Sequence, residues 1–168
     1  MTGSLRDSLE ATFRDVVVAP PGDDRLSVSA PADSIPAVLR YLREKSFDHL
    51  ALISCVDWIE RGRLEIVYLL ACYMRNDTDY LSEQKLHVFV RTEIPREEAA
   101  LHSVIGVFGN AEPYEREIHE LYGVHFHGHP RLIPLFLERE YEVPPFRKDF
   151  DTRRYVEQTF GSIPPVEG

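Results

Sequence analysis

Three histidines at alternate positions are the residues of this chain best able to bind a metal. His125, His127 and His129 follow an H-x-H-x-H pattern. Alternate side chains of an extended chain point the same way, so the three imidazoles could converge on one ion, as in a zinc site. No D-x-H or H-x-x-E-H pattern follows to supply further ligands or a base. The alternative is structural: His129-Pro130 forms a turn after Gly128 with its imidazole bonded to backbone, and the other two rings face solvent or a partner.

Carboxylates with the capacity for acid–base chemistry precede the histidines. At helical spacing Glu117 and Glu120 are neighbours, whereas Glu115 lies on another face, so the three do not form one cluster. Arg116 lies four residues from both Glu112 and Glu120, a spacing typical of ion pairs. No substrate motif accompanies them. The pattern therefore favours a charged helix that docks a partner over a catalytic acid–base pair.

A compact charged cluster comes later in the chain. Arg147, Lys148 and Asp149 lie between Phe146 and Phe150 and follow a double proline. Aromatic residues flanking charges are typical of protein interfaces, and the prolines lower the entropic cost of docking. The alternative is a solvated turn. If a partner orders this segment, its charges matter to assembly and contribute roughly 0–1 kcal/mol to folding of the isolated chain.

Apolar periodicity predicts the elements that position these residues. Helices are expected at 4–14, 34–42, 95–108 and 113–122, and strands at 16–18, 25–30, 50–59, 64–74 and 86–90. Turns or polar connections are expected at 20–24, 61–62, 75–79 and 109–110, and Gly123 is expected to end the last helix. This order predicts an α+β fold of two layers, with helices packed on a mixed or antiparallel sheet.

The chain changes character after residue 130. Regular periodicity fades and prolines recur, which disfavours long helices and central strands. We therefore expect an α+β domain over residues 1–130 and an extended, Pro-rich C-terminal arm over 131–168. The arm is expected to lie on another protein up to about residue 155, with the last dozen residues disordered.

Composition excludes several functions. The net charge of −9 and the pI of about 5.2 argue against nucleic acid and anionic membrane surfaces as ligands. The longest apolar run, Ile66 to Met74, is far shorter than the roughly 20 residues of a spanning helix, and the first residues do not form a secretory leader. The two cysteines, Cys55 and Cys72, are expected to be buried thiols and are too few for an iron–sulfur cluster. No dinucleotide or P-loop motif is present, so we expect no cofactor.

Two motifs together resemble a known family. Residues 115–130 read E-R-E-x-x-E-x-Y-G-V-x-F-x-G-H-P, and residues 145–150 read P-F-R-K-D-F. The pair resembles the C subunit of the NADH–quinone oxidoreductases (respiratory complex I) and the matching small subunit of membrane-bound hydrogenases. The resemblance covers most of the chain in the order of its elements and 113–151 in motif detail. The matching residues are Glu115, Arg116, Glu117, Gly123, Phe126, Gly128, His129, Pro130, Arg147, Lys148 and Asp149.

The resemblance implies a subunit without catalytic residues or cofactor in the peripheral arm of the complex. It implies packing against the quinone-site subunit, which is itself similar to the large subunit of nickel–iron hydrogenases, and a place at the cytoplasmic face of the inner membrane. His119-Glu120 and Ile133-Pro134 depart from the respiratory pattern. The stretches R-E-I-H-E-L-Y-G at 116–123 and R-K-D-F-D-T-R at 147–153 look closer to hydrogenase-type relatives. The alternatives are the equivalent subunit of a membrane-bound nickel–iron hydrogenase-like complex and, from another class, a free-standing metal-dependent hydrolase using His125, His127 and His129.

Overall fold

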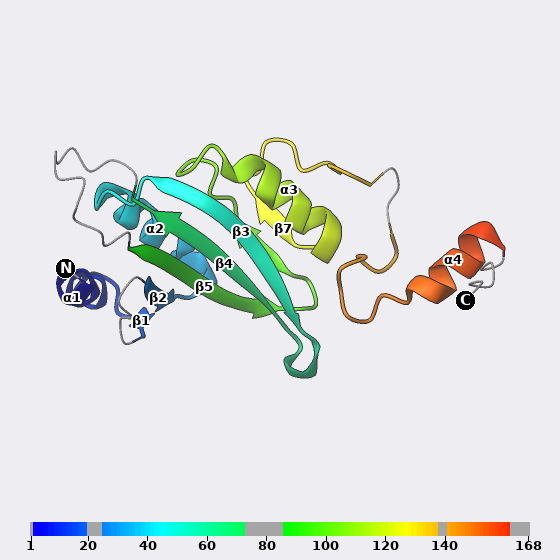
Figure 1. Cartoon of the computed structure of the whole chain (residues 1–168), viewed down its shortest axis with the longest axis horizontal. Coiled ribbons are helices and arrows are strands. Elements are labelled where there is room, and N and C mark those ends of the chain that lie inside the picture. The colour runs from blue at the N-terminus through cyan, green and yellow to red at the C-terminus, as the bar shows by residue number, and fades with distance from the viewer. Residues whose placement is uncertain (1, 20–24, 73–85, 138–140, 162–168) are drawn as a thin grey trace, which may run out of the picture.

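The computed structural model describes residues 2–19, 25–72, 86–137 and 141–161 (Figure 1). The α-helices are α1 (Thr2–Thr12), α2 (Ile35–Glu44), α3 (Ala111–Tyr122) and α4 (Thr152–Phe160). The strands are β1 (Val17–Val18), β2 (Arg25–Ser29), β3 (His49–Trp58), β4 (Arg63–Ala71), β5 (His87–Pro95), β6 (Ala100–His102) and β7 (His125–His127). Short 3-10 turns precede α2 and join β3 to β4. No helix in the described part of the chain has both the length and the apolar content to cross a membrane.

A five-stranded mixed sheet forms the centre of the fold. Its strand order is β1-β2-β5-β4-β3, with β2 and β5 parallel and the other neighbours antiparallel. Strands β6 and β7 form a separate parallel pair. The expected α+β fold with helices on a mixed sheet is confirmed.

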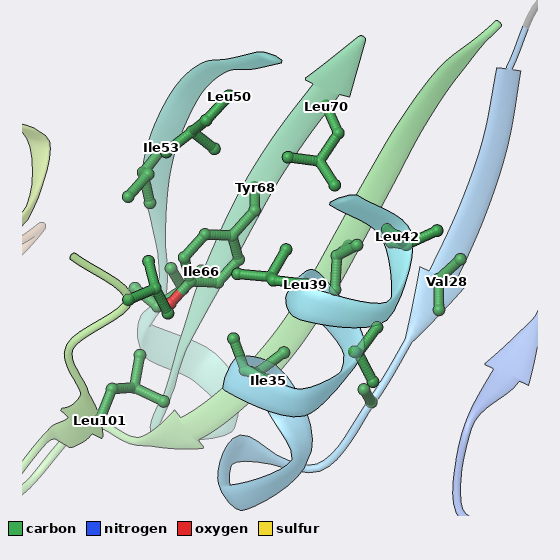
Figure 2. Packing of buried hydrophobic residues seen from close by; sticks show 14 of the residues in the cluster. Val28, Ile35, Leu39, Leu42, Leu50, Ile53, Ile66, Tyr68, Leu70 and Leu101 are labelled. Carbon is green, nitrogen blue, oxygen red and sulfur yellow. The ribbon is translucent and has the colours of Figure 1, made fainter. Parts of the chain in front are cut away.

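The core lies between one face of the sheet and α2, as Figure 2 shows. Alternate residues of β4 and β5 face this side and are buried, because side chains alternate across a strand. The apolar stripe of α2 packs on them: Ile35, Val38, Leu39 and Leu42. Burying each such side chain contributes about 1.5–3 kcal/mol. Tyr68 is fully buried among them.

Helix α3 packs beside β3, one of the two edge strands of the sheet. Asn110 donates its side-chain amide to the Leu50 carbonyl at 2.8 Å, and the Tyr114 hydroxyl donates to the Ala51 carbonyl at 2.9 Å. Both carbonyls belong to β3, which has a bulge between Leu50 and Leu52. Because an exposed edge invites unwanted pairing, this cover protects the sheet and fixes α3 beside it.

The helix expected over 95–108 is wrong. Strand β5 continues to Pro95, and Ala100–His102 forms β6, paired with β7. The backbone of Glu98 has φ of 51°, which an α-helix does not allow. The residues at helical spacing are instead buried from a strand and a set of turns, Leu101, Val104 and Phe108 among them.

Helix α4 was not expected, and it lies beyond the sheet in Figure 1. The disorder expected for the last dozen residues is wrong for 157–160, which complete this helix. The turn expected at 61–62 is confirmed, with Gly62 at φ of 61°. The connections expected at 20–24 and 75–79, and residues 162–168, lie outside the described residues.

Candidate docking site at the third helix and the Arg147 segment

Helix α3 ends where the sequence predicts, at Gly123. This glycine has φ of 72°, and its N–H donates to the His119 carbonyl at 2.9 Å. A Cβ there would lie 2.8 Å from Cγ of Pro144 and 3.3 Å from Nη2 of Arg147. Both the left-handed backbone and the close approach of the later segment therefore require glycine.

Glu115 is fully buried inside the chain. Its carboxylate accepts from the Ser103 hydroxyl and the Val104 N–H, each at 2.7 Å. Burial raises the pKa of Glu115, and the two hydrogen bonds oppose that rise. The carboxylate thus holds the turn after β6 against α3, and no donor from outside the chain is needed to satisfy it.

Arg116 and Glu120 hold the chain that follows the histidine motif. Arg116 donates from Nε to the Ile133 carbonyl at 3.0 Å and from Nη2 to the Pro134 carbonyl at 2.9 Å. Its expected ion pair with Glu112 is present at 3.3 Å. The expected pair with Glu120 is wrong, because that carboxylate accepts backbone N–H groups of residues 135–137 instead. A buried arginine thus attaches a non-helical segment to the helix.

The histidines do not converge. His129 accepts from the Arg131 N–H through Nδ1 at 3.0 Å, and its Nε2 lies 3.4 Å from the Glu112 carbonyl oxygen. His125 and His127 are exposed on β7, with ring centroids 4.8 Å apart. Within the described residues, no group of three or more His, Cys, Asp or Glu side chains is arranged to hold a metal ion. The backbone-bonded turn expected at His129 matches these contacts.

The remaining motif residues around the histidines are spread over several environments. Phe126 is buried in the core on β7. Gly128 has φ of 84°, which places the turn before His129. Glu117 is half-buried on α3, and Pro130 is exposed. The motif residues therefore do not form a cluster about one point.

Asp57 anchors the Arg147 segment, and the sequence did not single it out. Its carboxylate accepts two hydrogen bonds from Arg96, at 2.9 and 3.2 Å, and one from the Lys148 N–H at 2.8 Å. Arg96 also donates to Asp149. Burial alone would raise the pKa of Asp57, but the hydrogen bonds from Arg96 and Lys148 lower it overall. The signal available in the sequence was a carboxylate at an inward position of an otherwise apolar strand.

Arg147 and Lys148 occupy different environments. Arg147 is half-buried and donates from Nε to the Tyr122 carbonyl at 2.7 Å, at the end of α3. Lys148 is exposed, and its Nζ lies 5.9 Å from the centroid of the Trp58 ring. The expectation that a partner is needed to order this segment is wrong for 144–149, because Asp57, Arg96 and α3 already hold it.

Known proteins are similar to this chain in sequence and in fold. Residues 28–156 match the family model "Respiratory-chain NADH dehydrogenase, 30 Kd subunit". The chain is 35% identical over 129 residues to the C subunit of the F(420)H(2) dehydrogenase of Methanosarcina mazei, covering 76% of each chain. It is 35% identical over 164 residues to the C subunit of the NADH-quinone oxidoreductase of Phenylobacterium zucineum, covering 92% of this chain and 74% of the relative.

Solved structures agree with the sequence matches. A chain of the archaeal membrane-bound sulfane sulfur reductase superposes with a TM-score of 0.82 and 27% identity, covering 99% of this chain and 95% of that one. The trypsin-resistant fragment of Nqo5 superposes with a TM-score of 0.62 and 26% identity, covering 77% of this chain and 98% of the fragment.

These matches, with the α3 motif and the mixed sheet, define a subunit of a multisubunit respiratory complex. The chain belongs to the family of the 30 kDa subunit of respiratory-chain NADH dehydrogenase. The function expected from the sequence, a subunit of a complex-I-family NADH–quinone oxidoreductase, is confirmed.

Proposed function

We propose that this chain is the peripheral-arm subunit that packs against the quinone-site, hydrogenase-large-subunit-like subunit and carries no redox centre of its own. The supporting observation is the use of the motif residues. Glu115 and Arg116, two charged residues of the motif, are buried and form their hydrogen bonds with groups of the same chain. Because these two side chains are bonded inside the chain, they stabilise the shape of a docking surface and are not available to act on a substrate.

The docking surface lies after residue 130. Three phenylalanines there are strongly exposed, Phe136 at 66%, Phe146 at 58% and Phe160 at 70%. Exposed aromatic rings spaced along one segment are typical of a surface that a partner covers. Residues 1–130 then act as the α+β domain and 131–168 as the docking arm, in which Arg147, Lys148 and Asp149 contribute contacts. The chain reaches the cytoplasmic face of the membrane through the complex.

A second candidate is the equivalent subunit of a membrane-bound hydrogenase-like or related reductase complex. The similarity to a chain of the sulfane sulfur reductase complex favours it, because it extends over 99% of this chain. Both candidates place the subunit at the same position and differ in the electron donor or acceptor of the complex.

Deletion and complementation in the native host test the proposal. Membranes of the deletion strain are assayed for quinone reduction with NADH and reduced F420, for the oxidation of hydrogen and for the reduction of sulfane sulfur. The proposal predicts that one of these activities is lost and is restored by the wild-type gene. Loss of the NADH-linked activity supports the first candidate, and loss of one of the other activities supports the second. If all four activities are unchanged in a strain proved to lack the chain, both candidates are contradicted.

A further inference from the structure

Arg147 forms no ion pair within the described part of the chain. Its guanidinium is half-buried at the end of α3, where only Nε is bonded, to the Tyr122 carbonyl. Its Nη atoms have no hydrogen-bond partner, and no carboxylate lies within 4.0 Å, among the described residues. A partly desolvated cation is normally paired, because burying it alone is costly.

The nearest carboxylates are committed to another cation. Asp57 takes both of its side-chain hydrogen bonds from Arg96, and Asp149 also accepts from Arg96. Burial lowers the pKa of Arg147 and the nearby Arg96 lowers it further, while Asp149 and Asp57 offset part of this effect. The end of α3 supplies only partial negative charge through its carbonyls. The Nη atoms of Arg147 are therefore available to bind an anion from another chain.

The surroundings of Arg147 have the composition of an interface. We define the Arg147 surface as Trp58, Phe146, Arg147 and Lys148. Phe146 packs its ring edge-on to Tyr122, with centroids 5.9 Å apart, and remains 58% exposed. The ring of Trp58, 5.9 Å from Nζ of Lys148, is 37% exposed. Aromatic residues around an arginine are the usual centre of a tight protein contact.

We propose that the Arg147 surface receives a carboxylate-bearing segment of the hydrogenase-large-subunit-like subunit, and that an Asp or Glu of that segment pairs with the Nη edge of Arg147. The contact rests on the proposed function. Carboxylate is the matching chemistry, because the guanidinium edge presents parallel N–H donors in the geometry of two carboxylate oxygens. The Asp57 anchor holds the edge in place beforehand, which lowers the entropic cost of pairing.

Substitution of Arg147 by lysine separates this pairing from a merely structural role. A lysine keeps the charge and can still donate to the Tyr122 carbonyl, but it cannot form the two-point contact. The tagged chain, as wild type, Arg147→Lys, Arg147→Ala or Arg40→Ala, is purified from the native host lacking the untagged copy. The amount of large subunit recovered per chain is measured over a salt series. Arg40 is an exposed arginine of α2 and serves as the control.

We expect Arg147→Ala to weaken retention of the large subunit by about thirty-fold or more, because one partner of a desolvated charge pair is lost. Arg147→Lys should weaken retention by a smaller but measurable factor, because the charge remains and only the two-point contact is lost. Arg40→Ala should match wild type. Thermal melting of each isolated chain checks that Arg147→Lys is folded. Wild-type retention by a folded Arg147→Lys variant would overturn the pairing and leave the proposed function standing. Failure of the wild-type chain to recover the large subunit would overturn the proposed function, and the pairing with it.

Discussion

Replacing Asp57 by asparagine should destabilise the isolated chain more than any exposed carboxylate change. Asp57 is 4% exposed and accepts three hydrogen bonds, two from a charged guanidinium and one from the Lys148 N–H. Asparagine keeps the shape but loses the charge, and its NH2 group cannot accept a hydrogen bond from Arg96. Breaking a buried ion pair costs about 3–5 kcal/mol. Arg96 retains Asp149, whose side chain is 44% exposed, so the lower end of that range, about 3 kcal/mol, applies.

The assay is urea unfolding followed by circular dichroism at neutral pH, with thermal melting alongside. For a chain of this size each kcal/mol shifts Tm by about 2–4 °C, so about 3 kcal/mol lowers Tm by roughly 6–12 °C. Asp15→Asn is the control, because Asp15 is exposed, and it should stay within about 0.5 kcal/mol of wild type.

The pH dependence of the unfolding free energy also tests the contribution of the Asp57 carboxylate. The pKa of Asp57 is lowered by folding. Its contribution is therefore fully present above the unfolded pKa of about 3.9 and is lost as the pH falls through the lower folded pKa. The difference in unfolding free energy between wild type and Asp57→Asn should be constant above about pH 5 and shrink below about pH 4. An unfolding free energy of Asp57→Asn within about 0.5 kcal/mol of wild type at neutral pH would refute the role of Asp57 as an anchor of the Arg147 segment.

Three further predictions concern the same region. Gly123→Ala should lower the unfolding free energy by more than Gly62→Ala. Both glycines have positive φ, which costs an alanine about 1–2 kcal/mol, but only at Gly123 does the new Cβ contact Pro144. Equal urea midpoints for the two variants would show that Pro144 does not pack closely on Gly123. Glu115→Ala should lower the unfolding free energy by about 3 kcal/mol, because it removes the acceptor of the Ser103 hydroxyl and the Val104 N–H. Glu117→Ala should lower it by under about 1 kcal/mol. Similar losses in urea unfolding would contradict the stabilising role of the buried Glu115 carboxylate. With a thiol reagent at pH 8, Cys72 should react and Cys55 should not, because burial raises the pKa of Cys55 to about 12; rapid labelling of both thiols in native protein would show that Cys55 is not covered.

Much of the fold could be predicted from local patterns. The stripe Ile35, Val38, Leu39 and Leu42 repeats at helical spacing and is the buried face of α2. The alternation of apolar residues along the chain predicts strands β2 and β4. The region 95–108 could not be predicted, because Leu101 and Val104 also fit helical spacing. Their true positions depend on pairing of β6 with β7, a contact between distant parts of the chain.

The candidate site was predictable in its residues and not in its contacts. The motif identified Glu115 and Arg116, but their hydrogen-bond partners come from the turn after β6 and from the segment after residue 130. Asp57 is separated from Arg96 by 39 residues and from Lys148 by 91. No short-range sequence pattern can indicate hydrogen bonds between residues so far apart in the chain. Helix α4 escaped prediction because none of its residues is buried.

The number of large subunits that co-purify with the wild-type chain tests the central claim most directly. The chain is tagged at its own locus in the native host, solubilised in mild detergent, and purified for quantitative mass spectrometry of all co-purifying subunits. The account predicts about one hydrogenase-large-subunit-like subunit per chain, together with other subunits of a complex-I-family oxidoreductase. Recovery of the folded, tagged chain without any subunit of such a complex would contradict it.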